Sequence, residues 1–100
     1  MSKPARKEAE AAALQRDLNQ GLDYHRAGKL AAATKSYQKA LKRQRDNPRI
    51  HNNLGAVLRD AGRYPEAAKH LKKAISFEPS LISAYLNLAL CQLEMGDLNG

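Results

Sequence analysis

Three asparagines, Asn19, Asn53 and Asn87, recur at intervals of 34 residues. A side-chain amide offers a donor and an acceptor together, so it can pair with the N–H and C=O of a peptide backbone whatever side chains that peptide carries. Neighbouring helices lie about 8–10 Å apart, and an extended chain advances about 3.3 Å per residue. A row of such amides would therefore contact roughly every third residue of an extended polypeptide.

The residue types that commonly carry catalysis or bind metals form no comparable pattern. We expect His25, His51 and His70 to lie apart, with His51 in the packed interior. The sequence has no H-E-x-x-H motif, phosphate-binding loop or nucleophile elbow. Cys91 is the single cysteine and lies in an apolar stretch without a nearby base, which favours a small buried side chain over a nucleophile. We predict no enzyme activity, no metal site and no cofactor.

Composition and charge narrow the classes of protein further. The 100 residues are 43% hydrophobic, mainly alanine and leucine, which allows one small helical domain. The N-terminal residues lack the apolar core of a signal peptide, and no apolar run approaches the roughly 20 residues of a membrane span. We expect a cytoplasmic protein without a membrane partner. The net charge of +7 can attract acidic proteins or nucleic acid.

Small residues and prolines repeat with the same 34-residue interval as the asparagines. Gly21 aligns with Gly55 and Ala89, and Gly28 aligns with Gly62 and Gly96. The further alignments are Leu30 with Tyr64 and Leu98, Ala33 with Ala67, Tyr37 with Leu71, and Ala40 with Ala74. A repeat of this length indicates a solenoid in which each unit buries its apolar face against its neighbours.

These placements have physical reasons. Gly55 and Ala67 leave room for two helices to cross closely where larger side chains would clash. Gly62 ends a helix, because glycine readily takes the left-handed conformation of a C-cap. Pro65 suits the first turn of the next helix, and Pro79 stops that helix.

The 34-residue period and its pattern of residues resemble the tetratricopeptide repeat family. One full copy carries the family's positions at Leu54, Gly55, Leu58, Gly62, Tyr64, Ala67, Leu71, Ala74 and Pro79. His51 stands where tryptophan is usual, and Asp17 takes the aromatic position of the preceding copy. The resemblance implies an all-α, right-handed superhelical solenoid of antiparallel helix pairs, with about five helices.

The repeat register divides the chain into four parts. We predict an N-terminal helical extension over residues 1–13, repeat 1 over 14–47, repeat 2 over 48–81, and the first helix of a truncated third repeat over 82–100. Helices are predicted near 7–26, 31–44, 49–61, 65–77 and 82–95. The last helix is apolar on most sides, so we expect an exposed apolar face that could support self-association.

The family resemblance also implies a concave groove lined by the first helix of each repeat. Its candidate peptide-binding residues are Asn19, Asn53, Asn87, Asn52, Arg26, Arg49, Arg59 and His25. The asparagine row is similar to the ladder of O-linked N-acetylglucosamine transferase arrays, although solvated helix positions explain it equally well. Leu18 and Leu22 occupy positions where a carboxylate clamp for chaperone tails requires lysine and asparagine, which argues against such a clamp.

We therefore predict a protein–protein interaction module that binds an extended, acidic peptide in the groove. One alternative is a substrate-docking arm of a larger enzyme, such as a glycosyltransferase. Another is a nucleic-acid-binding repeat that uses the basic run Lys35, Lys39, Lys42, Arg43 and Arg45. The absence of interleaved aromatic residues disfavours nucleic acid, and a solvated outer face explains the basic run more simply.

Overall fold

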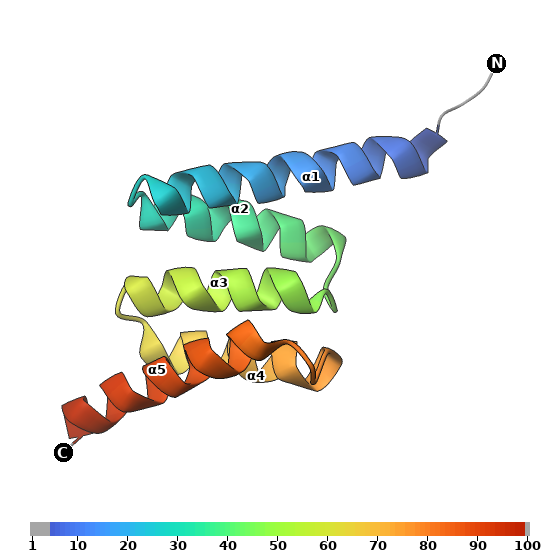
Figure 1. Cartoon of the computed structure of the whole chain (residues 1–100). Helices are drawn as coiled ribbons and strands as arrows, with labels where there is room; N and C mark the ends of the chain where they lie inside the picture. The colour runs from blue at the N-terminus through green and yellow to red at the C-terminus, as the bar shows by residue number, and fades with distance from the viewer. Residues whose placement is uncertain (1–4, 100) are drawn as a thin grey trace.

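The computed structural model of the protein describes residues 5–99, which form five helices and no strand. The helices are α1 (Ala5–Arg26), α2 (Leu30–Arg43), α3 (Pro48–Asp60), α4 (Tyr64–Phe77) and α5 (Ile82–Asn99). Figure 1 shows α1 to α4 stacked in chain order and α5 crossing in front of α4, with the two ends of the chain at opposite corners of the molecule. This arrangement is the predicted all-α solenoid of helix pairs, and four of the five predicted helices match to within two residues at each end.

The turn inside each helix pair depends on a glycine in the left-handed conformation. Gly28 and Gly62 have φ angles of 77° and 79°. After α3, the Gly62 N–H donates to the carbonyl of Arg59 and the Arg63 N–H donates to the carbonyl of Leu58, at 2.9 and 2.8 Å. These bonds satisfy carbonyls that the helix end would otherwise leave unpaired. The prediction that Gly62 ends a helix is confirmed.

The start of α3 is fixed by its own capping residue. The Asn47 side-chain oxygen accepts hydrogen bonds from the backbone N–H groups of Arg49 and Ile50, at 2.9 and 3.3 Å. Pro48 occupies the first turn, where a missing N–H costs nothing. Asparagine followed by proline therefore starts the first helix of repeat 2 at a defined residue.

Small residues allow the close helix crossings that the sequence predicts. A Cβ atom added to Gly55 would lie 2.6 Å from Cγ of Leu71 and 3.3 Å from the carbonyl oxygen of Ala67. In the first pair, a Cβ at Gly21 would lie 2.7 Å from the Tyr37 ring. Leu71 and Tyr37 are fully buried, so these glycines are the positions against which the core side chains pack.

The last helix exposes apolar side chains, as expected. Ile82, Leu86 and Leu93 are 78%, 61% and 67% exposed, whereas Ala84 and Cys91 on the opposite side of α5 are completely buried. Single exposed apolar residues are ordinary, but several on one helix face mark an interaction surface. Self-association through this face stays a prediction. Within residues 5–99, no helix is long and apolar enough to span a membrane.

One partly buried ion pair, between Asp17 and Arg43, was not predicted. Asp17 is only 4% exposed, and Nε of Arg43 donates to its carboxylate at 2.9 Å. The two residues join α1 to the end of α2 at the position where the family pattern has an aromatic side chain. Arg43 neutralises the buried carboxylate, and repeat 1 therefore tolerates a charged residue in its interior.

Candidate peptide-binding groove

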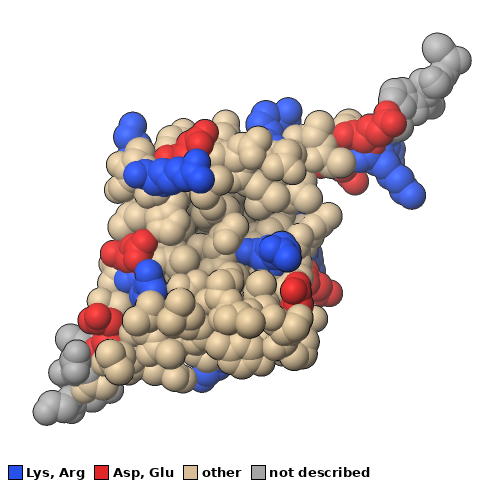
Figure 2. All heavy atoms as spheres, in the orientation of Figure 1, with Lys and Arg blue, Asp and Glu red and all other residues tan. Residues whose placement is uncertain are grey.

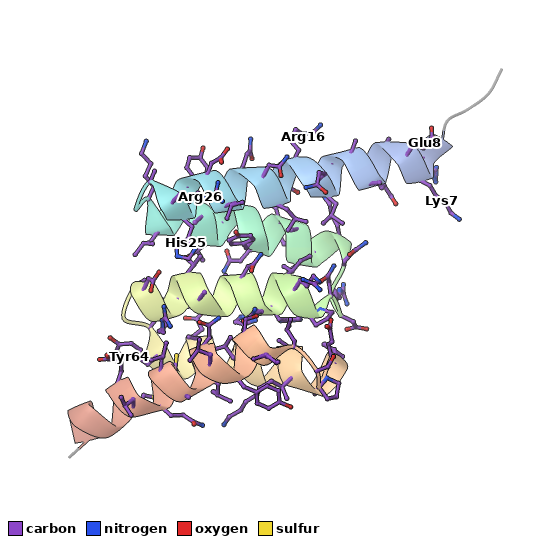
Figure 3. The ribbon with its side chains drawn as sticks, in the orientation of Figure 1. Lys7, Glu8, Arg16, His25, Arg26 and Tyr64 are labelled. Atoms are coloured by element: carbon purple, nitrogen blue, oxygen red, sulfur yellow. The ribbon has the colours of Figure 1, made fainter. Side chains whose placement is uncertain are left out.

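The first helices of the successive repeats, α1, α3 and α5, are the candidate binding elements. α3 packs directly on α5, and the C-terminal end of α1 reaches α3 through a contact between His25 and Asp60. Figure 3 shows His25 at this end of α1, on the side that faces α3. Side-chain contacts thus connect α1, α3 and α5, which we call the inner helices, and the three helices form one surface.

A chain of hydrogen bonds crosses this surface, and we call it the inner polar network. His25 Nε2 lies 2.7 Å from Oδ2 of Asp60, and Nη2 of Arg59 donates to Oδ1 of Asp60 at 3.1 Å. Arg59 Nη1 also donates to Oδ1 of Asn87 at 3.3 Å. The network continues through Asn87 toward the N-terminal end of α5, and it connects α1, α3 and α5.

Asn52 and Asn87 complete the inner polar network. Asn87 Nδ2 donates to Oδ1 of Asn52 at 2.9 Å, and Asn52 Nδ2 donates to Oγ of Ser83 at 2.7 Å. Asn52 is only 7% exposed, so its amide is used to join α3 to α5. Four of the predicted site residues, His25, Arg59, Asn52 and Asn87, therefore lie together.

The three asparagines of the predicted ladder have different surroundings. Asn53 is exposed, and its side chain makes no hydrogen bond to the described residues. Asn19 is also exposed but accepts a hydrogen bond from Nε2 of Gln15 at 3.0 Å within α1. Asn87 is half-buried and committed to the inner polar network. Among the three asparagines, Asn53 is thus the one whose amide makes no hydrogen bond to the described residues.

The remaining predicted cations lie at opposite ends of the surface. Arg26 follows His25 at the end of α1, and Figure 3 labels both there. Arg49 lies in the first turn of α3, beside a cavity of about 570 Å³ that the α2–α3 loop and Glu78 also line. It is ten residues from Arg59, which in a helix is about 15 Å. The arginines therefore form no single cluster.

The electrostatic centre of the inner polar network is Asp60. Burial alone would raise the pKa of this carboxyl group, but the hydrogen bonds from His25 and Arg59 and their charges outweigh burial. The pKa of Asp60 is consequently held below its ordinary value. Asp60 is therefore ionised at neutral pH and neutralises the positive charge of Arg59.

A shallow cavity of about 350 Å³ adjoins the network between α3 and α5. Arg59, Asp60, Tyr64, Leu90 and Glu94 line it. Leu90 is 40% exposed and adds an apolar contact beside the polar groups. This combination of apolar surface and a few fixed polar groups is typical of ligand sites.

Two of the three histidines lie together, and the expectation that all three lie apart is wrong. Nδ1 of His51 is 3.1 Å from Nδ1 of His70, and their rings stack with centroids 5.3 Å apart. Nε2 of His51 is 2.7 Å from the carbonyl oxygen of Arg45. Because a carbonyl oxygen only accepts, His51 carries its proton on Nε2. Nδ1 of His70 then donates to the unprotonated Nδ1 of His51. The contact joins α3 to α4, and His51 is buried as predicted.

We expect the histidine pair to lower the stability of the folded protein at mildly acidic pH. Burial, and then the neighbouring His51, lower the pKa of His70 in the folded protein, whereas an unfolded histidine titrates near pH 6.5. Below that pH the unfolded chain binds more protons, so stability falls as the pH is lowered. Thermal unfolding at pH 7.5 and 5.5 should show a Tm lower by a few degrees at pH 5.5. In His70→Gln this difference should shrink, and an unchanged difference would contradict the assignment.

Metal-binding and nucleophilic groups are not assembled in the described part of the chain. Among residues 5–99, no three His, Cys, Asp or Glu side chains are grouped to hold a metal ion. Cys91 is completely buried, and burial raises the pKa of its thiol, which keeps it protonated and inert. The interior position of Cys91 that the sequence predicts is confirmed.

The inner polar network has a sequence signal that the repeat alignment overlooked. Both the His25–Asp60 and the Asn52–Asn87 contacts join residues separated by 35 positions. Equivalent positions recur every 34 residues. In both contacts, a side chain therefore meets the residue that follows its own equivalent in the next repeat. A search for complementary polar pairs at this separation would have found both contacts.

Comparisons with known proteins agree with this architecture. The family model described as tetratricopeptide repeat matches residues 18–81. The chain is 33% identical over 73 residues to the TPR repeat-containing thioredoxin TTL4 of Arabidopsis thaliana, covering 73% of this chain and 11% of that protein. The chain thus spans about a tenth of the length of this relative.

Solved structures resemble the fold over most of its length. One is the TPR2B domain of yeast Sti1, with a TM-score of 0.83, 26% identity, and coverage of 86% of this chain and 69% of that one. Another is the O-GlcNAc transferase of Thermobaculum terrenum, with a TM-score of 0.78, 24% identity, and coverage of 91% and 16%. At that lower identity, the likeness to the transferase concerns the fold alone.

Proposed function

The chain belongs to the tetratricopeptide repeat family, and from that premise we propose that it is a protein–protein interaction module that binds an extended peptide across α1, α3 and α5. The observation that carries the proposal is the inner polar network, which joins the three helices before any ligand arrives. A fixed surface loses little conformational entropy on binding. The similar domain of yeast Sti1 was solved as a complex with pHsp70, which supports a peptide ligand.

The groups left free by the network define what the peptide must offer. Asn53 can pair with one backbone N–H and one C=O of an extended segment. Leu22 and Leu86, 41% and 61% exposed on α1 and α5, provide apolar contacts for aliphatic side chains. Arg26 and Arg49 lie at the two ends and favour acidic side chains there. The proposed ligand is thus an extended segment with a central aliphatic part and acidic ends.

A pull-down from cell lysate tests the groove. The wild type is compared with Asn53→Ala/Leu90→Ser, and the eluates are analysed for protein and nucleic acid at moderate and high salt. Loss of one amide contact and one apolar contact should weaken a groove ligand by about tenfold or more. A discrete protein that survives high salt should therefore disappear from the variant.

The control is Gln20→Ala/Gln92→Ser, which changes two exposed side chains of α1 and α5 that do not line the cavity. This control should retain the partner. If both double variants lost it equally, or if the wild type captured only salt-sensitive nucleic acid, the groove would not be the binding site.

A further inference from the structure

The positive charge of the folded chain is concentrated on the two outer helices. α2 and α4 together contain seven Lys and Arg residues and one acidic residue, Glu66. The inner helices α1, α3 and α5 contain six basic and seven acidic residues. Figure 1 shows α5 crossing in front of α4, and from this side Figure 2 shows largely uncharged surface along α5. The outer face therefore carries the surplus charge that attracts anionic partners.

A furrow on this outer face contains a cavity, which we call the outer cavity. α2 and α4 each pack on α3, so α3 forms the bottom of the space between them. The outer cavity has a volume of about 600 Å³. Leu54 of α3, which is buried, and Leu41 of α2, which is half-buried, supply its apolar lining. His70 of α4 lies on the opposite wall.

Four cations surround the apolar lining. They are Lys35, Lys39 and Lys42, which follow one face of α2, and Arg45 just beyond it. All four are exposed, and none takes part in the ion pairs found among the described residues. Arg43, by contrast, is turned inward onto Asp17. The outer cavity thus combines an apolar interior with a rim of unpaired positive charge.

We propose that the outer cavity binds an acidic protein segment, with one aliphatic side chain inserted between Leu41 and Leu54 and flanking carboxylates on the lysines of α2. The apolar lining favours an aliphatic group, and its volume lies within the usual range for ligand sites. The rim favours carboxylates on both sides of that group. The single ring among the residues that line the cavity, the imidazole of His70, is already stacked on His51, which disfavours stacking on a nucleic-acid base.

The test uses two fluorescein-labelled probes that differ in one residue. The first is the peptide Gly-Glu-Asp-Leu-Glu-Asp-Gly, and the second has serine in place of leucine. Fluorescence anisotropy at low salt should show binding of the leucine peptide about threefold tighter or more, because only leucine fills the apolar interior. In ¹³C-labelled protein, the methyl resonances of Leu41 and Leu54 should shift with the leucine peptide.

The protein variant is Lys35→Glu/Lys39→Glu, and its matched control is Arg6→Glu/Arg16→Glu. Both change the net charge equally, but Arg6 and Arg16 lie on α1, and Figure 3 shows Arg16 on the edge of α1 away from α2. The first variant should weaken binding by about tenfold and the control by much less. If circular dichroism shows that the glutamate variant is unfolded, Lys35→Gln/Lys39→Gln replaces it in the same comparison.

Three results would overturn the proposal. Equal weakening by the two charge variants would mean that only net charge attracts the peptide. Equal affinity for the two peptides would exclude use of the apolar interior. Tighter binding of a uridine oligonucleotide or of phosphatidylserine vesicles, lost in the lysine variant, would assign the site to phosphate-bearing partners. Binding should persist in Asn53→Ala/Leu90→Ser, which separates this site from the proposed groove.

Discussion

A Gly55→Val variant is expected to unfold at a temperature roughly 10–20 °C below the wild type, which corresponds to a loss of about 2–3 kcal/mol. Even the first carbon of the new side chain would lie 2.6 Å from Leu71, and the backbone oxygen of Ala67 is 3.3 Å away. Leu71 is completely buried and packs within the main core cluster, so any shift of its side chain disturbs other core residues. The helices α3 and α4 must therefore separate, and thermal unfolding followed by circular dichroism measures the cost.

Gly96→Val is the matched control for this prediction. Gly96 also lies within a helix, but a Cβ atom there would meet nothing within 4 Å. Valine has a higher helix propensity than glycine, so this variant should be neutral or slightly more stable. A similar loss of stability in the two variants would mean that the close crossing at Gly55 is unimportant. Combining Gly55→Val with Leu71→Ala should cost less than the sum of the two single changes.

The fold could be predicted from sequence because its determinants are local or repeat at a fixed interval. Gly62 ends α3 through its own backbone conformation, and Gly55 recurs in register with Gly21. These features identify helix ends and crossing points without knowledge of which side chains meet. The end of α5 was less predictable, since it continues to Asn99 past a glycine that takes no left-handed turn.

The candidate site was less predictable because its side chains interact with one another. The asparagine row suggested three equivalent amides, but Asn87 is bonded to Asn52 and Arg59, which leaves Asn53 in a different environment. Repeat alignment compares equivalent positions, whereas hydrogen bonds join non-equivalent positions of adjacent repeats. The stacking of His51 on His70 escaped prediction for the same reason, because it depends on the crossing of α3 and α4.

An Arg43→Met variant is expected to lose about 2–3 kcal/mol of stability, or roughly 10–20 °C in Tm. Asp17 is buried, and Arg43 donates to its carboxylate at 2.9 Å. Methionine keeps most of the apolar stem but removes the cation, so the carboxylate stays buried without its partner. Thermal and urea unfolding should agree on the loss. Arg45→Met, which removes an exposed arginine with no ion pair among the described residues, should change stability little.

The double variant Asp17→Leu/Arg43→Met should recover most of that stability. Asp17 is the buried member of the pair, and Arg43 is partly exposed. Replacing both with apolar side chains removes the desolvation cost of the carboxylate together with the interaction, and such replacements are often neutral or stabilising. Position 17 is also where the repeat pattern has an apolar aromatic residue, so a leucine there suits the surrounding packing. If the double variant were less stable than Arg43→Met alone, Asp17 would have a role in α1–α2 packing that the ion pair does not explain. Recovery would show that repeat 1 tolerates Asp17 only because Arg43 lies 26 residues further along the chain.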